Sequence, residues 1–465
     1  MLDSTKSVFI LICICTTIGI VPKILRPWVA ALLSIFYYWY STRDISIIFL
    51  SAFILSSFLP YLSLLIQDDR KAIFRRIRSA SICITVCFYL LFGICISSRF
   101  YSLSSSLPLR IPYILGISYI TLQVIDILLN SFESYFSSSW VEKLSYLIYS
   151  PQFAAGPVEK SGTLIPALSS PNISSIERRL IFSFKHLLPG LIRKSILLPI
   201  SHELIIYLKT SEDGIIGSIF LLVFSYFYLY QDIQSYTEIA QGVSALAGIR
   251  LVQNFKEPFR AITISDFMRR WHISVSEWFT SFIGKPIMKA IVRVKFLDNY
   301  TKELTGSIVF LAFGIWHGFS INSLICGLIL AFVYMFECWT KKKNMWNRWL
   351  GFLLVQSTAS VVCYLLLERN FKESISKLSI SNIMHLGTFD FITLDSVLGF
   401  AIILASLSLI GFDSSSKSLL RLIDSWLISQ PRPAIAIIYI AYIVGFSLLT
   451  FQSVPEQNNY MRLDF

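Results

Sequence analysis

The sequence of 465 residues is 55% hydrophobic and 15% aromatic, and only 15% of its residues are charged. Soluble domains contain roughly 25% charged residues, so this composition excludes an ordinary soluble globular protein. The formal net charge of +12 comes from basic loops between apolar segments, as expected for a membrane protein in contact with lipid, and it does not indicate nucleic acid binding.

Long apolar runs recur along the whole chain, and a helix of about 20 such residues can cross a hydrocarbon core of about 30 Å. The runs that could cross or nearly cross it are residues 8–21, 29–40, 45–66, 82–96, 111–129, 215–230, 307–336, 350–367, 397–412 and 434–451. No internal repeat or linker separates them. We therefore predict an all-α fold, a polytopic membrane protein of about 10 to 12 transmembrane helices with additional surface and re-entrant helices, in a single domain over residues 1–465.

Basic residues indicate how these spans are oriented. They gather in residues 70–78 and again in residues 341–348, and basic loops of this kind lie on the cytoplasmic side of membranes. The first apolar run is followed by Pro22, Lys23 and Arg26 without a small-residue cleavage site. We therefore expect a retained first span and not a signal peptide.

Two stretches, residues 140–212 and 252–302, are too polar to span a membrane and too apolar to be ordinary loops. We expect them to contain residues that are specific to the function. In the second stretch an apolar stripe recurs at helical spacing, formed by Phe267, Trp271, Val275, Trp278 and Phe282. It predicts an amphipathic helix that either lies at the membrane surface or packs over the helix bundle from the cytoplasmic side.

His317 lies within residues 307–336, a run of thirty residues without Asp, Glu, Lys or Arg. An ionisable side chain inside a membrane is costly and usually faces a protein interior or a wet cavity, so His317 is a candidate functional residue. Gly314 and Gly318 flank it, and the run exceeds one span. We expect the helix to break there or to be approached closely by another backbone or a ligand. The alternative is a neutral histidine bonded to a neighbouring helix.

The four other histidines lie in more polar surroundings. His272 is one position off the apolar stripe, where it could face the membrane surface, a cavity or solvent, and taken alone it is interpreted as structural. His186 and His202 lie among charged residues, and His385 lies in a polar segment. We assign no chemistry to these three.

A few carboxylates lie within or beside apolar runs. Asp232 and Glu238 follow the run that ends at Tyr230, and Asp126 lies inside another. Helix capping, or pairing with Arg or Lys across the bundle, accounts for such residues without a catalytic role. Their spacing does not predict metal binding, so we expect neither a metal nor a tightly bound cofactor.

Four sequence blocks occur in a defined order. They are Pro151-Gln152-Phe153-Ala154-Ala155-Gly156-Pro157, residues 232–240, Phe267-Met268-Arg269-Arg270-Trp271-His272-Ile273-Ser274, and Gly314-Ile315-Trp316-His317-Gly318. Together they resemble the bacterial branch of the membrane-bound O-acyltransferase (MBOAT) family, which includes alginate O-acetyltransferases and the D-alanyl transferases of teichoic acid. The resemblance is strongest over residues 151–318. Its third and fourth blocks are specific, because a Trp-His-Ile-Ser segment followed by a membrane Trp-His-Gly is improbable by chance.

The resemblance implies roles for individual residues. In this family the histidine of the Trp-His-Gly block is taken as catalytic, and the histidine of the Trp-His-Ile-Ser block is a second important one. These roles fall on His317 and His272. The same blocks imply substrate-binding residues, which are Trp316, Asp232, Tyr236 and Gln152.

The chain also departs from the family pattern at two places. Relatives usually read Asp-Phe-Ser-Gly-Tyr-Ser-Asp where this chain has residues 232–238, which lack the glycine and keep a carboxylate at each end. Relatives commonly show Arg-Asp-Tyr after the position of Trp278, where this chain has Thr280, Ser281 and Phe282. These departures bear on the donor or the partner more than on the chemistry.

The resemblance implies an integral O-acyltransferase of the bacterial plasma (inner) membrane. It would move an acetyl or similar small acyl group from an activated donor, an acyl thioester of coenzyme A or of a carrier protein on the cytoplasmic side, to a hydroxyl of an exported glycan or wall polymer. Other envelope-modification proteins are possible partners. The alternatives are an inactive MBOAT-like scaffold and a polymer or lipid transporter, although the sequence shows neither the inverted repeats nor the paired membrane charges of transporters.

Overall fold

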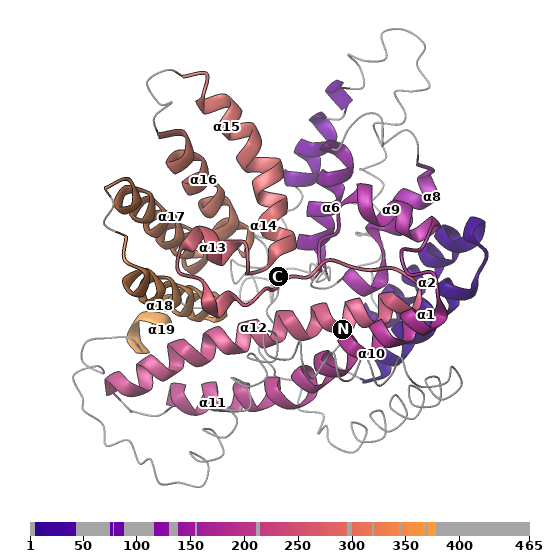
Figure 1. The fold of residues 1–465 in the computed structure, drawn as a ribbon, viewed down its shortest axis with the longest axis horizontal. Coiled ribbons are helices and arrows are strands. Elements are labelled where there is room, and N and C mark those ends of the chain that lie inside the picture. Colours follow the sequence, from indigo (N-terminus) through magenta and orange to yellow (C-terminus); the bar gives the residue numbers. More distant parts are fainter. Residues whose placement is uncertain are drawn as a thin grey trace, which may run out of the picture. The chain divides into compact units, whose positions relative to one another are not determined.

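The computed structural model describes residues 5–42, 75–77, 79–87, 116–129, 138–153, 156–210, 214–294, 300–318, 320–343, 346–368 and 371–377. All regular elements in these ranges are helices, and they contain no strand (Figure 1). The predicted all-α fold class is therefore confirmed for the described part of the chain.

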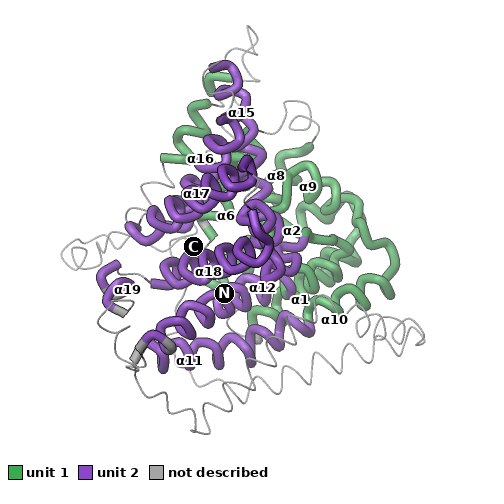
Figure 2. Tube along the Cα trace, turned by 60° about the vertical axis from the view of Figure 1, so that its left-hand side comes forward, with its two compact units in different colours: residues 1–187, 239–252, 465 green, residues 188–238, 253–464 purple. Residues whose placement is uncertain are grey.

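The chain forms two compact units (Figure 2). Unit 1 comprises residues 1–187, 239–252 and 465, and unit 2 comprises residues 188–238 and 253–464. Each unit is described by itself below. The expected single domain over residues 1–465 stays a prediction.

Unit 1 is built from helices of the N-terminal part of the chain. They are α1 (Thr5–Ile20), η1 (Lys23–Leu25), α2 (Arg26–Thr42), α6 (Ile117–Leu129), α8 (Trp140–Leu147), η3 (Ser150–Gln152), α9 (Ser161–Ser169) and most of α10 (Ile176–Ile192). In α6 the buried Asp126 carboxylate accepts hydrogen bonds from the Tyr146 hydroxyl at 3.0 Å and from the backbone N–H of Ser161 at 2.6 Å. Ser161 begins α9, so Asp126 supports a helix N-terminus, one of the two roles expected for it.

Unit 2 contains the third and fourth of the four sequence blocks and most of the second. Its helices are η4 (Arg193–Leu197), α11 (Leu198–Thr210), most of α12 (Gly214–Leu246), η5 (Pro258–Arg260), α13 (Ile264–Met268), α14 (Ile273–Phe279), η6 (Thr280–Gly284), α15 (Lys285–Ile291), α16 (Thr301–Trp316), α17 (Ile321–Lys342), α18 (Arg348–Leu367) and α19 (Phe371–Lys377). The segments η4 and η6 have π-helical geometry.

The predicted apolar runs can be compared with these helices. The runs 8–21, 29–40, 111–129, 215–230 and 350–367 correspond to α1, α2, α6, α12 and α18. The runs 45–66, 397–412 and 434–451, and the second half of 82–96, lie outside the described residues. Two described helices, α17 and α18, are long and apolar enough to cross a membrane by length and composition. The total of about 10 to 12 spans stays a prediction.

The run 307–336 is interrupted, as expected from its glycines. Helix α16 ends at Trp316 and α17 begins at Ile321. Near the start of α16, Glu303 lies 3.9 Å from the amine of Lys342 at the end of α17, so the two helices form an antiparallel hairpin. A Cβ atom added to Gly314 would lie 2.6 Å from both the Cα and the backbone N of Gly327. Glycine therefore allows the two backbones to approach closely just before the break.

This close approach generates a prediction about stability. Gly314→Ala places a methyl group against the backbone of α17, and overpacking of this kind costs on the order of 1 to 3 kcal/mol. We expect a lower melting temperature for this variant than for the wild type when the full chain is heated in a mild detergent. Gly162→Ala in α9 is the matched control, because an added Cβ there meets no atom within 4 Å. Equal melting temperatures for Gly314→Ala and Gly162→Ala would contradict the tight packing of the hairpin.

Candidate functional site

His317 occupies the break between the two helices of the hairpin. It is the residue that follows the last helical residue of α16, with φ −67° and ψ −10°, and its N–H donates to the Gly314 carbonyl at 3.2 Å. Gly318 then takes a φ of 154°, which residues with a side chain rarely adopt. The backbone therefore leaves the helix at His317, and the partly buried ring is presented from the turn and not from the middle of a continuous helix.

The predicted amphipathic helix is not continuous, so that part of the prediction is wrong. Helix α13 ends at Met268 and α14 begins at Ile273. Between them His272 takes the left-handed conformation, with φ 46° and ψ 52°, at which a helix cannot continue. The stripe residues Phe267, Trp271, Val275 and Trp278 are all buried within the protein, which agrees with the packing alternative and not with a stripe that faces lipid.

Asn254 supplies the hydrogen bonds that stabilise the turn at His272. Its backbone carbonyl accepts the N–H of Ile273 at 2.8 Å. Its side-chain oxygen accepts the hydroxyl of Ser274 at 2.6 Å and the N–H of Ser274 at 3.3 Å. The side-chain amide donates to the hydroxyl of Thr237 on α12 at 3.0 Å. One fully buried asparagine thus joins the start of α14 to α12.

Aromatic packing holds the residue that precedes His272. The Trp271 ring stacks on Phe267 with centroids 5.4 Å apart, and it meets the edge of Phe255 at 4.9 Å. Tyr226 of α12 lies 5.4 Å from the same indole. Tyrosine and tryptophan rings bury a large apolar area, so this cluster fixes the α13–α14 turn against α12.

A buried carboxylate on α17 stabilises the other end of this segment. Glu337 accepts hydrogen bonds from the N–H groups of Ile264 and Ser265 at 2.7 and 3.4 Å and from the Ser265 hydroxyl at 3.0 Å. The amine of Lys341 lies 2.7 Å from the same carboxylate. Ile264 and Ser265 begin α13, so a negative charge sits where unsatisfied N–H groups favour it. The sequence analysis missed Glu337, although it directly follows the uncharged run.

These supports bring the two candidate catalytic histidines together. The rings of His272 and Trp316 meet edge to face with centroids 6.3 Å apart, and the His317 ring lies 4.9 Å from Trp316. Phe313 lies 4.6 Å from the His317 ring, and Phe279 of α14 packs on Phe313 and Trp316 at 5.7 and 6.0 Å. Two motifs 45 positions apart in the sequence thus form one aromatic cluster.

The carboxylates of α12 have basic partners from the preceding helical segment. Asp232 lies 3.0 Å from the amine of Lys194, and Glu238 lies 3.0 Å from the guanidinium of Arg193. Arg193 also donates to the side-chain oxygen of Gln231 at 2.8 Å. This confirms the expectation of pairing across the bundle for both carboxylates. Among the described residues, the charged partner of Asp232 is Lys194 and not a residue of the histidine cluster.

The remaining candidates are placed separately. Tyr236 lies one turn after Asp232 on α12 and is buried. Gln152 belongs to unit 1, where its side-chain amide donates to the carbonyl of Tyr146 at 3.1 Å. His202 is buried with its imidazole 3.8 Å from the Glu203 carboxylate, and His186 packs 4.4 Å from Phe182. His385 lies outside the described residues, among which no group of three side chains is arranged to hold a metal ion.

Comparison with known proteins identifies the class of protein as a membrane-bound acyltransferase. The profile of the membrane-bound O-acyltransferase family matches residues 34–342. The chain belongs to this family.

Individual relatives are similar over part of their length. The teichoic acid D-alanyltransferase of Bacillus subtilis is 27% identical over 55% of this chain and 68% of the relative. The corresponding enzyme of Streptococcus thermophilus is 26% identical over 50% and 59%. The peptidoglycan O-acetyltransferase of Helicobacter pylori is 30% identical over 44% of this chain and 38% of the relative. The chain thus spans about two thirds or less of the length of these relatives.

The Asn254 network generates a second prediction. Asn254→Ala removes three side-chain hydrogen bonds from a buried site, and leaving buried polar groups unsatisfied costs about 1 to 3 kcal/mol. We expect faster amide hydrogen exchange across residues 270–279 in this variant. Asn347→Ala is the matched control, because Asn347 caps α18 with its side chain at an exposed position. Unchanged exchange at residues 270–279 in Asn254→Ala would exclude the proposed support of the His272 turn.

Proposed function

We propose that this protein transfers an acyl group, acetyl or a similar small acyl, from an activated donor to a hydroxyl of an exported polysaccharide or cell-envelope polymer, with His317 as the general base. One observation carries the proposal: the polypeptide leaves α16 at His317, and the ring lies in an aromatic cluster with Trp316 and His272. Both ring nitrogens of His317 are buried in the structure, so a substrate that reaches them would enter at this break.

In the proposed reaction the acyl donor is a thioester. The neutral imidazole of His317 takes the proton of the acceptor hydroxyl as its oxygen attacks the acyl carbonyl carbon. A new C–O ester bond forms and the C–S bond breaks, and the thiolate leaves and takes up a proton. General-base assistance of this kind typically contributes about 10² to 10⁴ in rate. The aromatic walls of the site reduce the water that would otherwise hydrolyse the donor.

The other candidates receive supporting roles in this proposal. His272 is the second histidine, held in a left-handed turn that favours few residue types, and such backbone strain concentrates at functional sites. Trp316 separates the two imidazoles and offers an apolar wall to the acyl group. Asp232, Tyr236 and Gln152 are proposed to bind substrate, Asp232 together with its partner Lys194.

The proposed setting is a bacterial plasma (inner) membrane that the chain crosses about 10 to 12 times. The donor, coenzyme A or a carrier protein bearing the acyl thioester, would approach from the cytoplasm, where the basic loops are expected. The acceptor would approach from outside. The relatives named for teichoic acid and peptidoglycan support a polymer of the cell envelope as acceptor. Other envelope-modification proteins are the proposed partners.

An inactive scaffold and a transporter are the competing functions, and the departures at Ser235 and Thr280 are the features that suggested the first. In the structure these hydroxyls make local contacts: Ser235 donates to the carbonyl of Asp232 at 2.8 Å, and Thr280 to that of Ser276 at 2.8 Å. Neither contact favours an alternative function. Mass spectrometry of envelope glycans from cells with and without the protein distinguishes an acyltransferase from both competitors.

We expect His317→Ala to abolish the acyl ester on the extracellular polymer while the amount of protein in the membrane stays unchanged. The reason is that the proposed base is lost, and His272, the other imidazole of the cluster, lies beside Trp316 and is not expected to replace it. The ester is measured by mass spectrometry after mild alkaline release. His202→Ala is the control, since it removes another buried histidine of unit 2 and should leave the ester content intact. Normal ester content in His317→Ala would end the claim of general-base catalysis.

For His272 we expect a smaller loss, and two substitutions separate its ring from its backbone. Asparagine tolerates the left-handed conformation better than most residues, so His272→Asn keeps the turn and removes the imidazole. His272→Ala disturbs both. Reduced ester content in both variants, with the melting temperature lowered more by alanine, is the expected result. Wild-type ester content in His272→Asn would return His272 to a purely structural role.

A further inference from the structure

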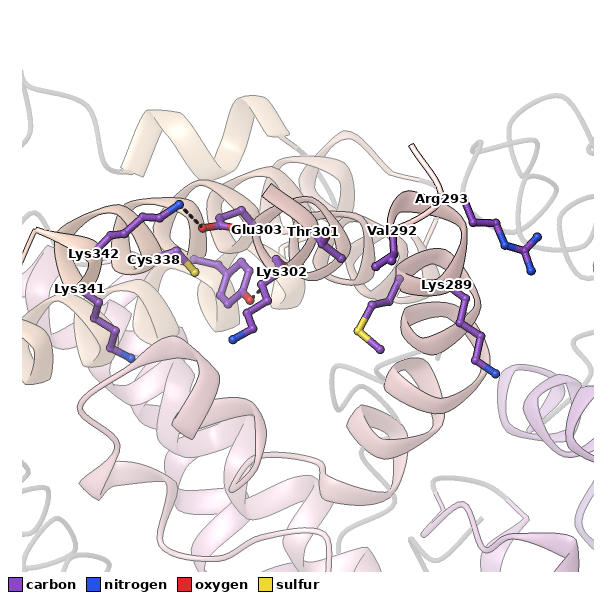
Figure 3. A pocket seen from close by; sticks show the side chains of 11 residues that line it. Lys289, Val292, Arg293, Thr301, Lys302, Glu303, Cys338, Lys341 and Lys342 are labelled. Carbon is purple, nitrogen blue, oxygen red and sulfur yellow. Dashed lines mark hydrogen bonds and ion pairs between the residues drawn. The ribbon is translucent and has the colours of Figure 1, made fainter. Parts of the chain in front are cut away.

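A hollow of about 920 Å³ lies in unit 2 at the ends of α15, α16 and α17 that are remote from His317 (Figure 3). Its walls include Met288, Val292 and Tyr334, which are apolar or aromatic. Positive side chains line it from two directions. Lys289 and Arg293 come from the region of α15, and Lys341 and Lys342 come from the end of α17, with Lys302 at the start of α16 (Figure 3).

The positive charge of this hollow is only partly balanced. Lys341 pairs with Glu337 at 2.7 Å, and Lys342 lies 3.9 Å from Glu303. Lys289, Arg293 and Lys302 make no ion pair with any residue that the structure describes. Glu303 is the one acidic side chain among the described residues that line the hollow. Three cations that have no acidic partner among the described residues, beside an apolar floor, suit a ligand with a negative group and a hydrocarbon part.

The outer face of α17 shows where such a ligand would extend. Its exposed side chains form an apolar stripe at helical spacing, which consists of Ile321, Leu324, Leu328, Phe332, Met335, Phe336 and Trp339. Helix α17 is long and apolar enough to cross a membrane. The stripe therefore faces acyl chains, and beside its last turns Tyr334, Cys338 and Lys342 of the same helix line the basic hollow.

Aromatic and basic residues mark this end of α17 as the membrane–water interface. The amine of Lys343 lies 4.6 Å above the Trp339 ring, and the amine of Lys342 lies 5.5 Å above the Tyr300 ring. Both rings are exposed. Tryptophan and tyrosine gather at the level of lipid headgroups, and basic residues there attract anionic lipids.

We propose that this hollow is a binding site for the phosphate headgroup of an anionic membrane phospholipid. Lys289 and Arg293 on one side of the hollow and Lys302 on the other attract the phosphate diester, and the acyl chains lie along the exposed stripe of α17. A soluble phosphate compound would use the cations without the stripe. An acidic protein would use the rim and leave the apolar floor uncovered, so the lipid accounts for more of the site. The proposal is independent of the acyl-transfer reaction.

The test uses the full chain purified in a neutral maltoside detergent. Binding of dioctanoylphosphatidylglycerol is measured by native mass spectrometry and by the rise in melting temperature. Dioctanoylphosphatidylcholine serves as the zwitterionic lipid with the same chains, and glycerol phosphate serves as the headgroup without chains. The pocket variant combines Lys289→Gln, Arg293→Gln and Lys302→Gln. The matched control, Lys23→Gln with Lys256→Gln and Lys285→Gln, removes three exposed positive charges outside the hollow.

We expect the wild type and the control variant to bind the anionic lipid in preference to the zwitterionic one. The pocket variant should bind it at least about tenfold more weakly, because each basic residue near a lipid surface contributes severalfold in affinity. Equal affinities in the pocket and control variants would overturn the proposal. The proposal is also overturned if glycerol phosphate binds as tightly as the lipid.

Discussion

The candidate site of unit 2 depends on the buried side chain of Asn254, which joins the start of α14 to α12 by hydrogen bonds. The chain must pass from α13 to α14 through a left-handed residue, and it must do so with its polar groups out of contact with water. Buried backbone groups are costly unless they are hydrogen-bonded. Asn254 provides acceptors for Ile273 and Ser274 and uses its own amide on Thr237, so the turn at His272 becomes a stable feature of the core.

Contacts connect α14 to α16, α16 to α17, and α17 back to α13, the helix that precedes the turn. Helix α14 reaches α16 through Phe279, which packs on Trp316. Helix α16 reaches α17 through the contact of Gly314 with Gly327. Helix α17 then returns to the start of α13 through the Glu337 carboxylate. Each of these contacts is a different kind of interaction. Together they constrain the positions of His272 and His317 from both sides.

The sequence predicted the features that are local and missed those that depend on distant partners. The helix break at His317 was predictable, because two glycines and a run longer than one span leave few alternatives. Pairing of Asp232 and Glu238 with basic residues was expected from the cost of burying a charge. The prediction of one continuous helix through residues 267–282 was wrong. The apolar side chains do recur at helical spacing, but hydrogen bonds from Asn254, which lies earlier in the sequence, impose a turn at His272. Hydrophobic periodicity describes only which side chains share a helix face, so it cannot predict a hydrogen bond donated or accepted by a distant segment.

The length of the hairpin also sets the distance between the basic hollow and His317. Helix α16 starts at Thr301, beside the basic hollow, so His317 is 16 residues along the chain from the hollow, or roughly 24 Å at 1.5 Å per residue. If the basic end is cytoplasmic, His317 lies nearer the outer surface. In the proposed reaction, an acceptor from outside would then have a short path to His317, and a donor from the cytoplasm a long one.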